Sequence, residues 1–152
     1  MNQTFSHIHT LGELKAAAYQ TLPVRAEMRK NFLARLRAGQ KLMPGIVGYE
    51  ETVLPEIENG VLAGHHMIFL GERGQAKSRI IRSLADLLDD FVPAIKGCEI
   101  NDDPYAPICR QCRRLLAENG DELELAWIDR ERRYAEKLAT PDVSVADLIG
   151  EA

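Results

Sequence analysis

The sequence predicts an α/β fold on two observations. A short apolar run at 66–70 leads into a glycine-rich turn at 71–78, and apolar residues then recur at helical spacing over 79–88. A break at 43–45 separates this part from an N-terminal stretch whose apolar residues also recur at helical spacing. The predicted division is a helical segment over 1–43 and an α/β core over 44–152.

Two helices are predicted in the N-terminal segment. Thr10 and Glu13 match a capping box, which begins a short helix that runs to about residue 20. After Pro23, apolar residues recur every four positions and basic residues fill the other face, which predicts an amphipathic helix ending at Gly39. The residues predicted to point inward are Val24, Met28, Phe32, Leu33 and Leu36.

Helices and strands are predicted to alternate in the core. A helix over 51–63, with Leu54, Ile57, Val61 and Leu62 inward, precedes a strand at 66–70. The further predicted elements are a helix at 78–90, a strand at 94–99, a helix at 109–118 and a strand at 123–127.

Length and composition are those of a globular domain. The chain has 152 residues, of which 45% are hydrophobic and 28% charged. No apolar run is long enough to span a bilayer, and the N-terminus lacks the basic start and apolar stretch of a signal peptide. Three cysteines, all between positions 98 and 112, argue against a disulfide framework. We therefore expect a cytoplasmic protein without membrane contact.

Charge is unevenly distributed along the chain. Residues 1–44 hold seven Lys/Arg and two Asp/Glu, whereas residues 45–152 hold twelve and twenty-one. Such asymmetry can mark a nucleic-acid or partner surface, but solvated helix faces explain it more simply. We do not expect nucleic acid as a partner.

The turn at 71–78 has the chemistry of a phosphate-binding loop. The pattern of such loops is G-x-x-x-x-G-K-[ST], which Gly71, Lys77 and Ser78 match, whereas Ala76 replaces the second glycine. Backbone N–H groups at a helix N-terminus bind phosphate oxygens, and glycine lets the backbone approach them. Lys77 is predicted to neutralise the β and γ phosphates of a nucleotide, and the Ser78 hydroxyl to coordinate Mg²⁺.

Ala76 fits this loop if its φ is negative, because a methyl group then costs little. The N–H groups from Gly74 to Lys77 are predicted to cradle the β phosphate, and Lys77 is the predicted catalytic residue, acting by position and charge. The predicted nucleotide-binding residues of the loop are Glu72, Arg73, Gly74, Gln75, Ala76, Lys77, Ser78 and Arg79. The alternative is a glycine turn before an ordinary helix.

The cysteines form a second candidate site. Cys98, Cys109 and Cys112 have the spacing C-x₁₀-C-x₂-C, and the closing C-x₂-C is a common half of a zinc site. The pattern lacks a fourth ligand. The alternative is three thiols without metal, with Cys109 and Cys112 on one helix face.

Several segments together resemble a known family. The loop at 71–78 and the segments 46–50 and 99–104 resemble the bacterial AAA+ ATPases related to magnesium chelatase subunit I, in the MoxR/chelatase-like branch. The segments 138–142 and 146–150 are similar to a later signature of that branch. The resemblance extends from about residue 12 to the end of the chain.

This resemblance implies an AAA+ core of the P-loop NTPase class that binds ATP with Mg²⁺. It also implies homo-oligomeric rings that remodel a partner protein, which the sequence does not identify. In the family, Val47 and Gly48 would lie near the adenine, and alanine at position 76 resembles the branch's own variant. Members of the chelatase group can carry cysteine where Asp102 stands, so Asp102 or Asp103 could complete a Cys₃Asp zinc site.

One part of the family's site has no clear counterpart. A working AAA+ site needs a strand that ends in Asp-Glu, which holds Mg²⁺ and orients water. Asp129 follows an apolar run but precedes Arg130 instead of Glu, and this stretch resembles the region before that strand in the family. The chain thus resembles the N-terminal part of a longer ATPase with an incomplete core, and we expect no hydrolysis from it alone.

Two functions follow from these features, and a third is disfavoured. The first is the ATP-binding portion of an AAA+ ATPase that couples ATP binding and hydrolysis to remodelling of a partner. The alternative is a binding or assembly module that hydrolyses nothing, with a structural zinc site as an option. A small-molecule kinase is disfavoured, because such kinases place the loop near the N-terminus and here over sixty residues precede it.

Overall fold

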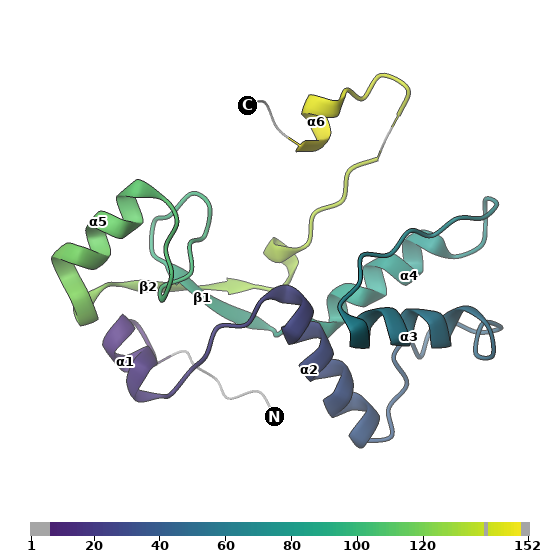
Figure 1. Ribbon diagram of the computed structural model, residues 1–152, viewed down its shortest axis with the longest axis horizontal. Coiled ribbons are helices and arrows are strands. Elements are labelled where there is room, and N and C mark those ends of the chain that lie inside the picture. Colours follow the sequence, from purple (N-terminus) through teal and green to yellow (C-terminus); the bar gives the residue numbers. More distant parts are fainter. Residues whose placement is uncertain (1–6, 139, 150–152) are drawn as a thin grey trace.

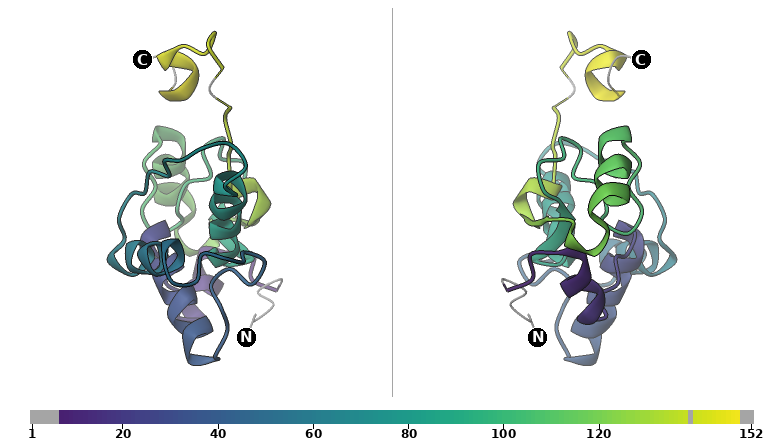
Figure 2. Two further views of the ribbon diagram at one scale, coloured as in Figure 1. Left: turned by 90° about the vertical axis from the view of Figure 1, so that its right-hand side faces the viewer. Right: turned by 90° about the vertical axis from the view of Figure 1, so that its left-hand side faces the viewer.

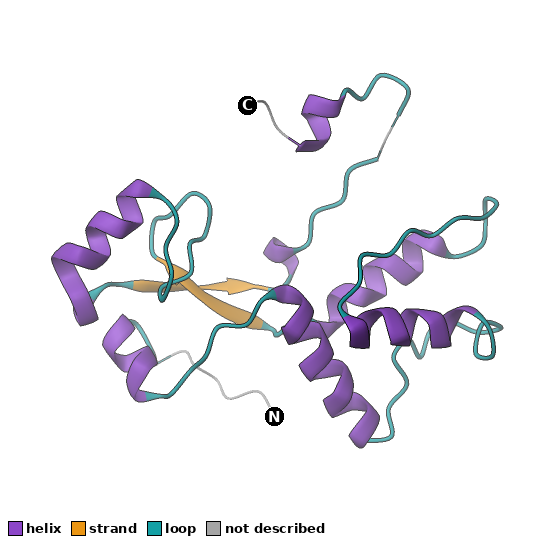
Figure 3. Ribbon diagram, viewed as in Figure 1, coloured by secondary structure: helices purple, strands orange, loops and turns teal. Residues whose placement is uncertain are grey.

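The computed structural model describes residues 7–138 and 140–149, which form a mixed α/β structure (Figure 1). A two-stranded sheet has α1 and α5 toward one end and α2, α3 and α4 toward the other (Figure 3). The helices are α1 (Leu11–Ala16), α2 (Val24–Arg37), α3 (Val53–Ala63), α4 (Lys77–Leu84), α5 (Arg110–Asn119) and α6 (Val145–Ile149). The strands are β1 (Phe91–Ile95) and β2 (Leu125–Asp129), and short 3₁₀ turns occupy Ala85–Leu87, Gly120–Glu122 and Glu131–Arg133.

The first core is built by α2, α3 and α4. Leu54, Ile57 and Val61 are buried on one face of α3, as their spacing predicts. Ile80 of α4 and Phe32 of α2 pack into the same cluster. Burying a side chain of this size contributes about 1.5–3 kcal/mol relative to leaving it in water. The other buried members are Leu42, Met43, Ile46 and Leu87.

The predicted inward face of α2 is only partly correct. Phe32 is fully buried, but 52% of Val24 and 44% of Leu36 remain exposed. Glu27 is buried instead, with 2% of its surface exposed. The helix is therefore rotated so that a carboxylate, which the hydrophobic pattern does not favour, faces the interior.

The second core joins α1 and α5 to the sheet. Thr10 and Glu13 form the predicted capping box, since the Glu13 N–H donates to Thr10 Oγ1 (3.3 Å) and the Thr10 N–H donates to the Glu13 carboxylate (3.1 Å). The helix that they begin places Leu11 and Leu14 in the core. The other buried members are Ile8, Ile95, Cys112, Leu123 and Leu125.

The sheet is antiparallel, with Phe91 opposite Asp129 and Ile95 opposite Leu125. The strand predicted at 123–127 corresponds to β2, whereas the strand predicted at 94–99 overlaps β1 only at its end. β1 stops at Ile95 because Gly97, at φ 77°, turns the chain away. A sheet of two strands with flanking helices is compatible with part of an α/β domain.

The strand predicted at 66–70 does not form within the described residues. Met67 and Phe69 pack against the first core, whereas 86% of Ile68 and 89% of Leu70 are exposed. Burial thus alternates as in a strand. A strand also needs a neighbour for its backbone N–H and C=O groups, and both described strands pair with each other elsewhere. The prediction is wrong because an apolar run indicates that side chains are buried but does not show that a partner strand is available.

A buried ion pair connects α2 to the turn after β2. The Arg133 guanidinium donates to both Glu27 carboxylate oxygens, at 2.7 and 2.5 Å, and the Asp89 N–H donates to Glu27 Oε1 at 2.6 Å. Nearby, Arg130 pairs with Asp90. These contacts hold α2 against the residues that precede β1 and follow β2.

The C-terminal segment projects from this body and carries α6 (Figure 2). Within 7–138 and 140–149, no helix is long and apolar enough to cross a membrane.

Candidate functional site

The start of α4 presents backbone donors without a cap. Ala76 is the N-cap residue, and no side chain accepts a hydrogen bond there. The first N–H groups of a helix have no partner within it, and the helix dipole makes this end positive. The first backbone bond of this turn runs from the Ile80 N–H to the Ala76 carbonyl at 2.9 Å. The N–H groups of Lys77, Ser78 and Arg79 can therefore receive an anion.

The Lys77 ammonium lies inside the loop that precedes α4. Its Nζ donates to the carbonyl of Gly71 at 2.8 Å and also to the carbonyl of Glu72. The structure thus brings a cation to the same place as the free N–H groups. An ammonium exchanges neutral carbonyl partners readily for phosphate oxygens, because hydrogen bonds between charged groups are stronger. The Ser78 side chain, one residue on, is exposed.

The loop backbone departs from the expectation at one position. Ala76 has φ 56°, in the left-handed region, rather than the negative φ that the sequence argument required. This conformation costs a residue with a Cβ about 1–2 kcal/mol. Gly74, at φ 84°, also lies in this region, where glycine carries no strain. At Gly71, an added Cβ would lie 2.1 Å from Gln75 Oε1. The motif has glycine at position 76 because the backbone there adopts a positive φ. Ala76 adopts the same φ with some strain.

The segment before α3 lies against this loop. Ile46 is buried in the same core as Ile80, and the Tyr49 hydroxyl donates to the Gln75 carbonyl at 3.5 Å. A Cβ added to Gly45 would lie 2.8 Å from Arg79 Nη2. The two loops stand at the same end of the molecule, beyond the N-terminal ends of α3 and α4 (Figure 1).

The residues predicted near the adenine belong to this segment. Val47 is 80% exposed, and Gly48 adopts φ 88°. Tyr49, which the sequence analysis did not name as a site residue, contacts the loop through its hydroxyl. The signal that could have found it is an aromatic side chain directly after Gly48.

Asp129 does not lie at the loop. It pairs with Phe91 across the sheet, and β1 follows the C-terminal end of α4, whereas Ser78 is at its N-terminal end. The helix rises by about 9 Å over the six steps from Ser78 to the end of α4 at Leu84. The Asp129 carboxylate instead accepts the Arg132 N–H at 2.9 Å and holds a 3₁₀ turn. Asp129 is therefore not a ligand for a metal bound by Ser78.

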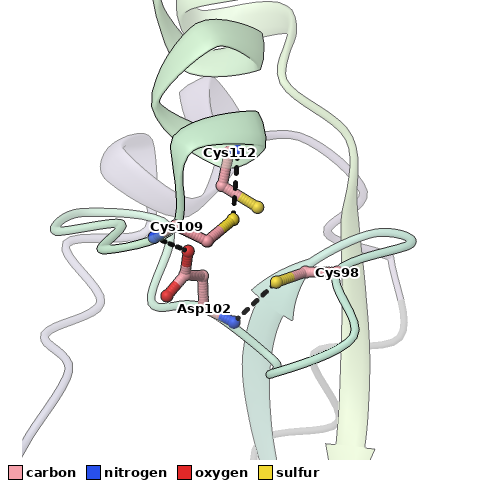
Figure 4. A group of neighbouring side chains, drawn as sticks. All are labelled: Cys98, Asp102, Cys109 and Cys112. Atoms are coloured by element: carbon pink, nitrogen blue, oxygen red, sulfur yellow. Dashed lines mark hydrogen bonds between the residues drawn. The ribbon is translucent and has the colours of Figure 1, made fainter. Parts of the chain in front are cut away.

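The second candidate site is a cluster of Cys98, Asp102, Cys109 and Cys112, here called the Cys₃Asp cluster (Figure 4). Their ligand atoms all lie within 4.8 Å of one another. Cys98 and Asp102 come from the turn after β1, while Cys109 caps α5 and Cys112 lies in its first turn. The structure thus brings together the three cysteines that the sequence paired only by spacing.

Backbone donors serve the cluster's acceptors. The Asp102 N–H donates to Cys98 Sγ at 3.4 Å, the Cys109 N–H to Asp102 Oδ2 at 2.9 Å, and the Cys112 N–H to Cys109 Sγ at 3.2 Å. The first of these bonds lowers the pKa of Cys98 from its ordinary value. Burial raises the pKa of Asp102, but N–H donors from Cys109 and Ile108 outweigh it, so that this pKa lies below its usual range. Burial raises the pKa of the Cys112 thiol.

Asp103, the other carboxylate considered as a fourth ligand, faces elsewhere. Its Oδ2 accepts the Thr21 hydroxyl at 2.8 Å, and its Oδ1 accepts the Tyr105 N–H at 2.9 Å. These bonds attach the loop after β1 to the segment that follows α1. The structure therefore selects Asp102 over Asp103.

Comparison with known proteins gives one partial relationship. The chain is 37% identical over 71 residues to a magnesium-chelatase subunit ChlI homolog of Methanocaldococcus jannaschii. The match covers 45% of this chain and 19% of that protein, so the chain spans about a fifth of the length of the relative. No family model and no solved structure matches the chain. The comparison supports a chelatase-like relationship for part of the chain.

Proposed function

We propose that residues 71–79 bind ATP with Mg²⁺, and that the chain supplies the nucleotide-binding part of an AAA+ ATPase of the magnesium-chelatase-like group. The start of α4 carries this proposal. It combines unpaired N–H groups, the positive end of the helix dipole and the Lys77 ammonium at one place. The partial similarity to a ChlI homolog is independent support.

Each group has a distinct task toward a triphosphate. The N–H groups from Gly74 to Lys77 cradle the β phosphate, and Lys77 leaves the Gly71 and Glu72 carbonyls to bind the β and γ phosphates. Ser78 provides a hydroxyl to Mg²⁺, which neutralises phosphate charge when bound.

Neighbouring residues complete the proposed nucleotide site. Glu72, Arg73 and Arg79 border it, and Val47 and Gly48 lie on the side proposed for the adenine. Tyr49 couples this side to the loop through Gln75. We also propose that the protein acts as a homo-oligomeric ring that couples ATP binding and hydrolysis to remodelling of a partner protein.

A binding module without turnover is the alternative, and one contact favours it for these residues. Hydrolysis needs a group that positions water beside the γ phosphate. The one candidate carboxylate, Asp129, holds a turn at the other end of α4. We therefore expect nucleotide binding without measurable turnover by residues 1–152 alone.

The test is binding of a fluorescent ATP analogue in the presence of Mg²⁺. Lys77→Ala removes a charge-assisted contact worth about 1.5–3 kcal/mol, so affinity should fall by roughly 10- to 150-fold. The fold should persist, because Lys77 bonds only to exposed loop carbonyls. Lys96→Ala is the matched control, since Lys96 pairs with Glu124 on the exposed edge of the sheet region.

Unchanged affinity in Lys77→Ala would show that the loop is not the nucleotide site. An equal loss in Lys96→Ala would show that general charge, not the loop, attracts the nucleotide.

A further inference from the structure

The Cys₃Asp cluster lies apart from the proposed nucleotide site. It is at the start of α5, whereas the phosphate-binding loop is at the start of α4, toward opposite ends of the molecule (Figure 1). No residue of the cluster takes part in the contacts of that loop. The cluster therefore requires its own explanation.

Two separate turns prepare the cluster. After β1, the Cys98 N–H donates to the Ile95 carbonyl at 3.2 Å, and the Ile95 N–H donates to the Asp102 carbonyl at 3.0 Å. These bonds bring Cys98 and Asp102 to the same side of the turn. At α5, Cys109 is the N-cap and Cys112 follows three residues later, so both sulfur atoms lie at the positive end of the helix.

The spacing of the ligand atoms is close to that of a tetrahedral metal site. With Zn–S bonds of about 2.3 Å, the ligands of a tetrahedron lie about 3.8 Å apart. The four ligand atoms here lie within 4.8 Å of one another. Small rotamer movements of the three thiols and the carboxylate can therefore place all four around one ion.

Burial of Asp102 argues against metal-free thiols. Only 5% of this residue is exposed. Among the residues that the structure describes, no Lys or Arg forms an ion pair with it, and its carboxylate accepts the Cys109 N–H at 2.9 Å. Backbone donors such as this one are neutral, so a bound metal ion would supply the positive charge that no side-chain cation provides.

We propose that Cys98, Asp102, Cys109 and Cys112 bind one Zn²⁺ ion as a structural site. Three thiolates favour Zn²⁺ over Mg²⁺ or Ca²⁺, which prefer oxygen ligands, and one carboxylate is a permitted fourth ligand. Four protein ligands leave no open position for a reacting water, so the ion stabilises rather than catalyses.

The ion would fasten the loop between β1 and α5. This loop also carries Asp103, bonded to Thr21, and Tyr105, whose hydroxyl donates to the Tyr19 carbonyl at 2.9 Å. Zinc would thus hold α5, the sheet and the segment after α1 as one unit.

The metal content of the full chain, purified under reducing conditions without chelator, tests the proposal. Mass spectrometry of the metals should find about one Zn²⁺ per chain. Replacement by Co²⁺ should give the thiolate charge-transfer and strong visible bands of tetrahedral Co²⁺. Chelation of the metal should lower the Tm of the protein.

Neighbouring carboxylates provide a matched pair of variants. Asp102→Asn should weaken Zn²⁺ binding by at least about tenfold, whereas Asp103→Asn should bind Zn²⁺ as the parent does. If Asp102→Asn does not fold, Cys98→Ser, at a less buried ligand, and the Co²⁺ spectrum of the parent protein decide. Lys77→Ala should retain zinc, so failure of the nucleotide proposal would not imply failure of this one.

Three results would overturn the site. One is a parent protein that neither contains zinc nor binds added Zn²⁺ while its thiols are reduced. Another is an Asp102→Asn protein that is folded and holds Zn²⁺ as tightly as the parent. A stable Cys109–Cys112 disulfide in freshly purified protein, without zinc, would also contradict it.

Discussion

Replacing Arg133 by methionine should strongly destabilise the fold. Arg133 donates to both carboxylate oxygens of Glu27, a residue of α2 that is 2% exposed. The hydrogen bonds that Arg133 donates to Glu27, together with the negative charge of that carboxylate, raise the pKa of Arg133 above its ordinary value. Methionine fills most of the arginine's volume, so the variant isolates the loss of the cation from the creation of a cavity.

The expected loss follows from leaving one charge buried alone. Without Arg133, the hydrogen-bond donor left to the Glu27 carboxylate among residues 7–138 and 140–149 is the Asp89 N–H, at 2.6 Å. Removing one partner of a buried ion pair costs about 3–5 kcal/mol. For a chain of this length, each kcal/mol lowers the Tm by about 2–4 °C. The Tm of Arg133→Met should therefore fall by roughly 6–20 °C.

An exposed ion pair of the same chemistry provides the control. Arg82 donates to both oxygens of Glu136 at 2.9 and 2.8 Å, but both side chains are largely exposed, at 62% and 45%. Such pairs contribute about 0–1 kcal/mol. Arg82→Met should thus change stability little.

Urea unfolding monitored by the fluorescence of Trp127 measures both variants. A double variant, Glu27→Met with Arg133→Met, should be more stable than Arg133→Met alone, because no charge is then left buried. If Arg133→Met costs no more than Arg82→Met, burial of the pair has no energetic consequence and the reasoning is wrong.

Two further predictions concern the second core. Burial raises the pKa of Tyr19 to about 12 from its ordinary 10.0, so the neutral phenol stabilises the folded state below pH 10 and this contribution is lost as the pH rises toward 12. The free energy of unfolding should fall less over this window in Tyr19→Phe than in the parent, and equal falls would contradict the assignment. Thr10→Ala should cost about 1 kcal/mol by removing the cap of α1. Thr52→Ala, at an N-cap whose side chain makes no capping bond, should cost almost nothing in the same urea titration, and equal losses would refute the capping role.

Local chemistry made the first helix predictable from the sequence. The capping box needs only Thr10 and Glu13, three residues apart, and the structure contains both of its hydrogen bonds. The same holds for the C-x₂-C pair, whose spacing places Cys109 and Cys112 together at the start of α5. Interactions this short in sequence are fixed by the geometry of one helical turn.

Contacts between distant parts of the chain were not predictable. Glu27 and Arg133 are 106 positions apart, and a glutamate on a helix is ordinarily assigned to the solvent. The choice of Asp102 over Asp103 also depends on the fold, because adjacent residues of a turn can point either way. Here Thr21 and Tyr105 engage Asp103 and leave Asp102 with the cysteines.

The loop before α4 has one feature that the sequence motif predicts and one that it does not. Lys77 and the helix start follow from the motif, and both are present where the motif places them. The conformation of Ala76 does not follow, because the sequence argument assumed that a residue with a Cβ avoids positive φ. The strain of about 1–2 kcal/mol is small beside the packing of Ile80 and Ile46 that positions the loop, so the surrounding core can impose it.

The segment at 66–70 shows that burial of side chains and pairing of backbones in a sheet are separate questions. In the structure, Met67 and Phe69 pack against the first core while Ile68 and Leu70 are exposed, although all four residues are apolar in the sequence. The apolar run was not enough to predict a strand, because the ladder depends on hydrogen-bonding groups from another element. Within the described residues, β1 and β2 pair with each other, and neither pairs with this segment. The composition of this segment therefore indicates only that some of its side chains are buried, and the sheet is decided by which backbones are available to pair.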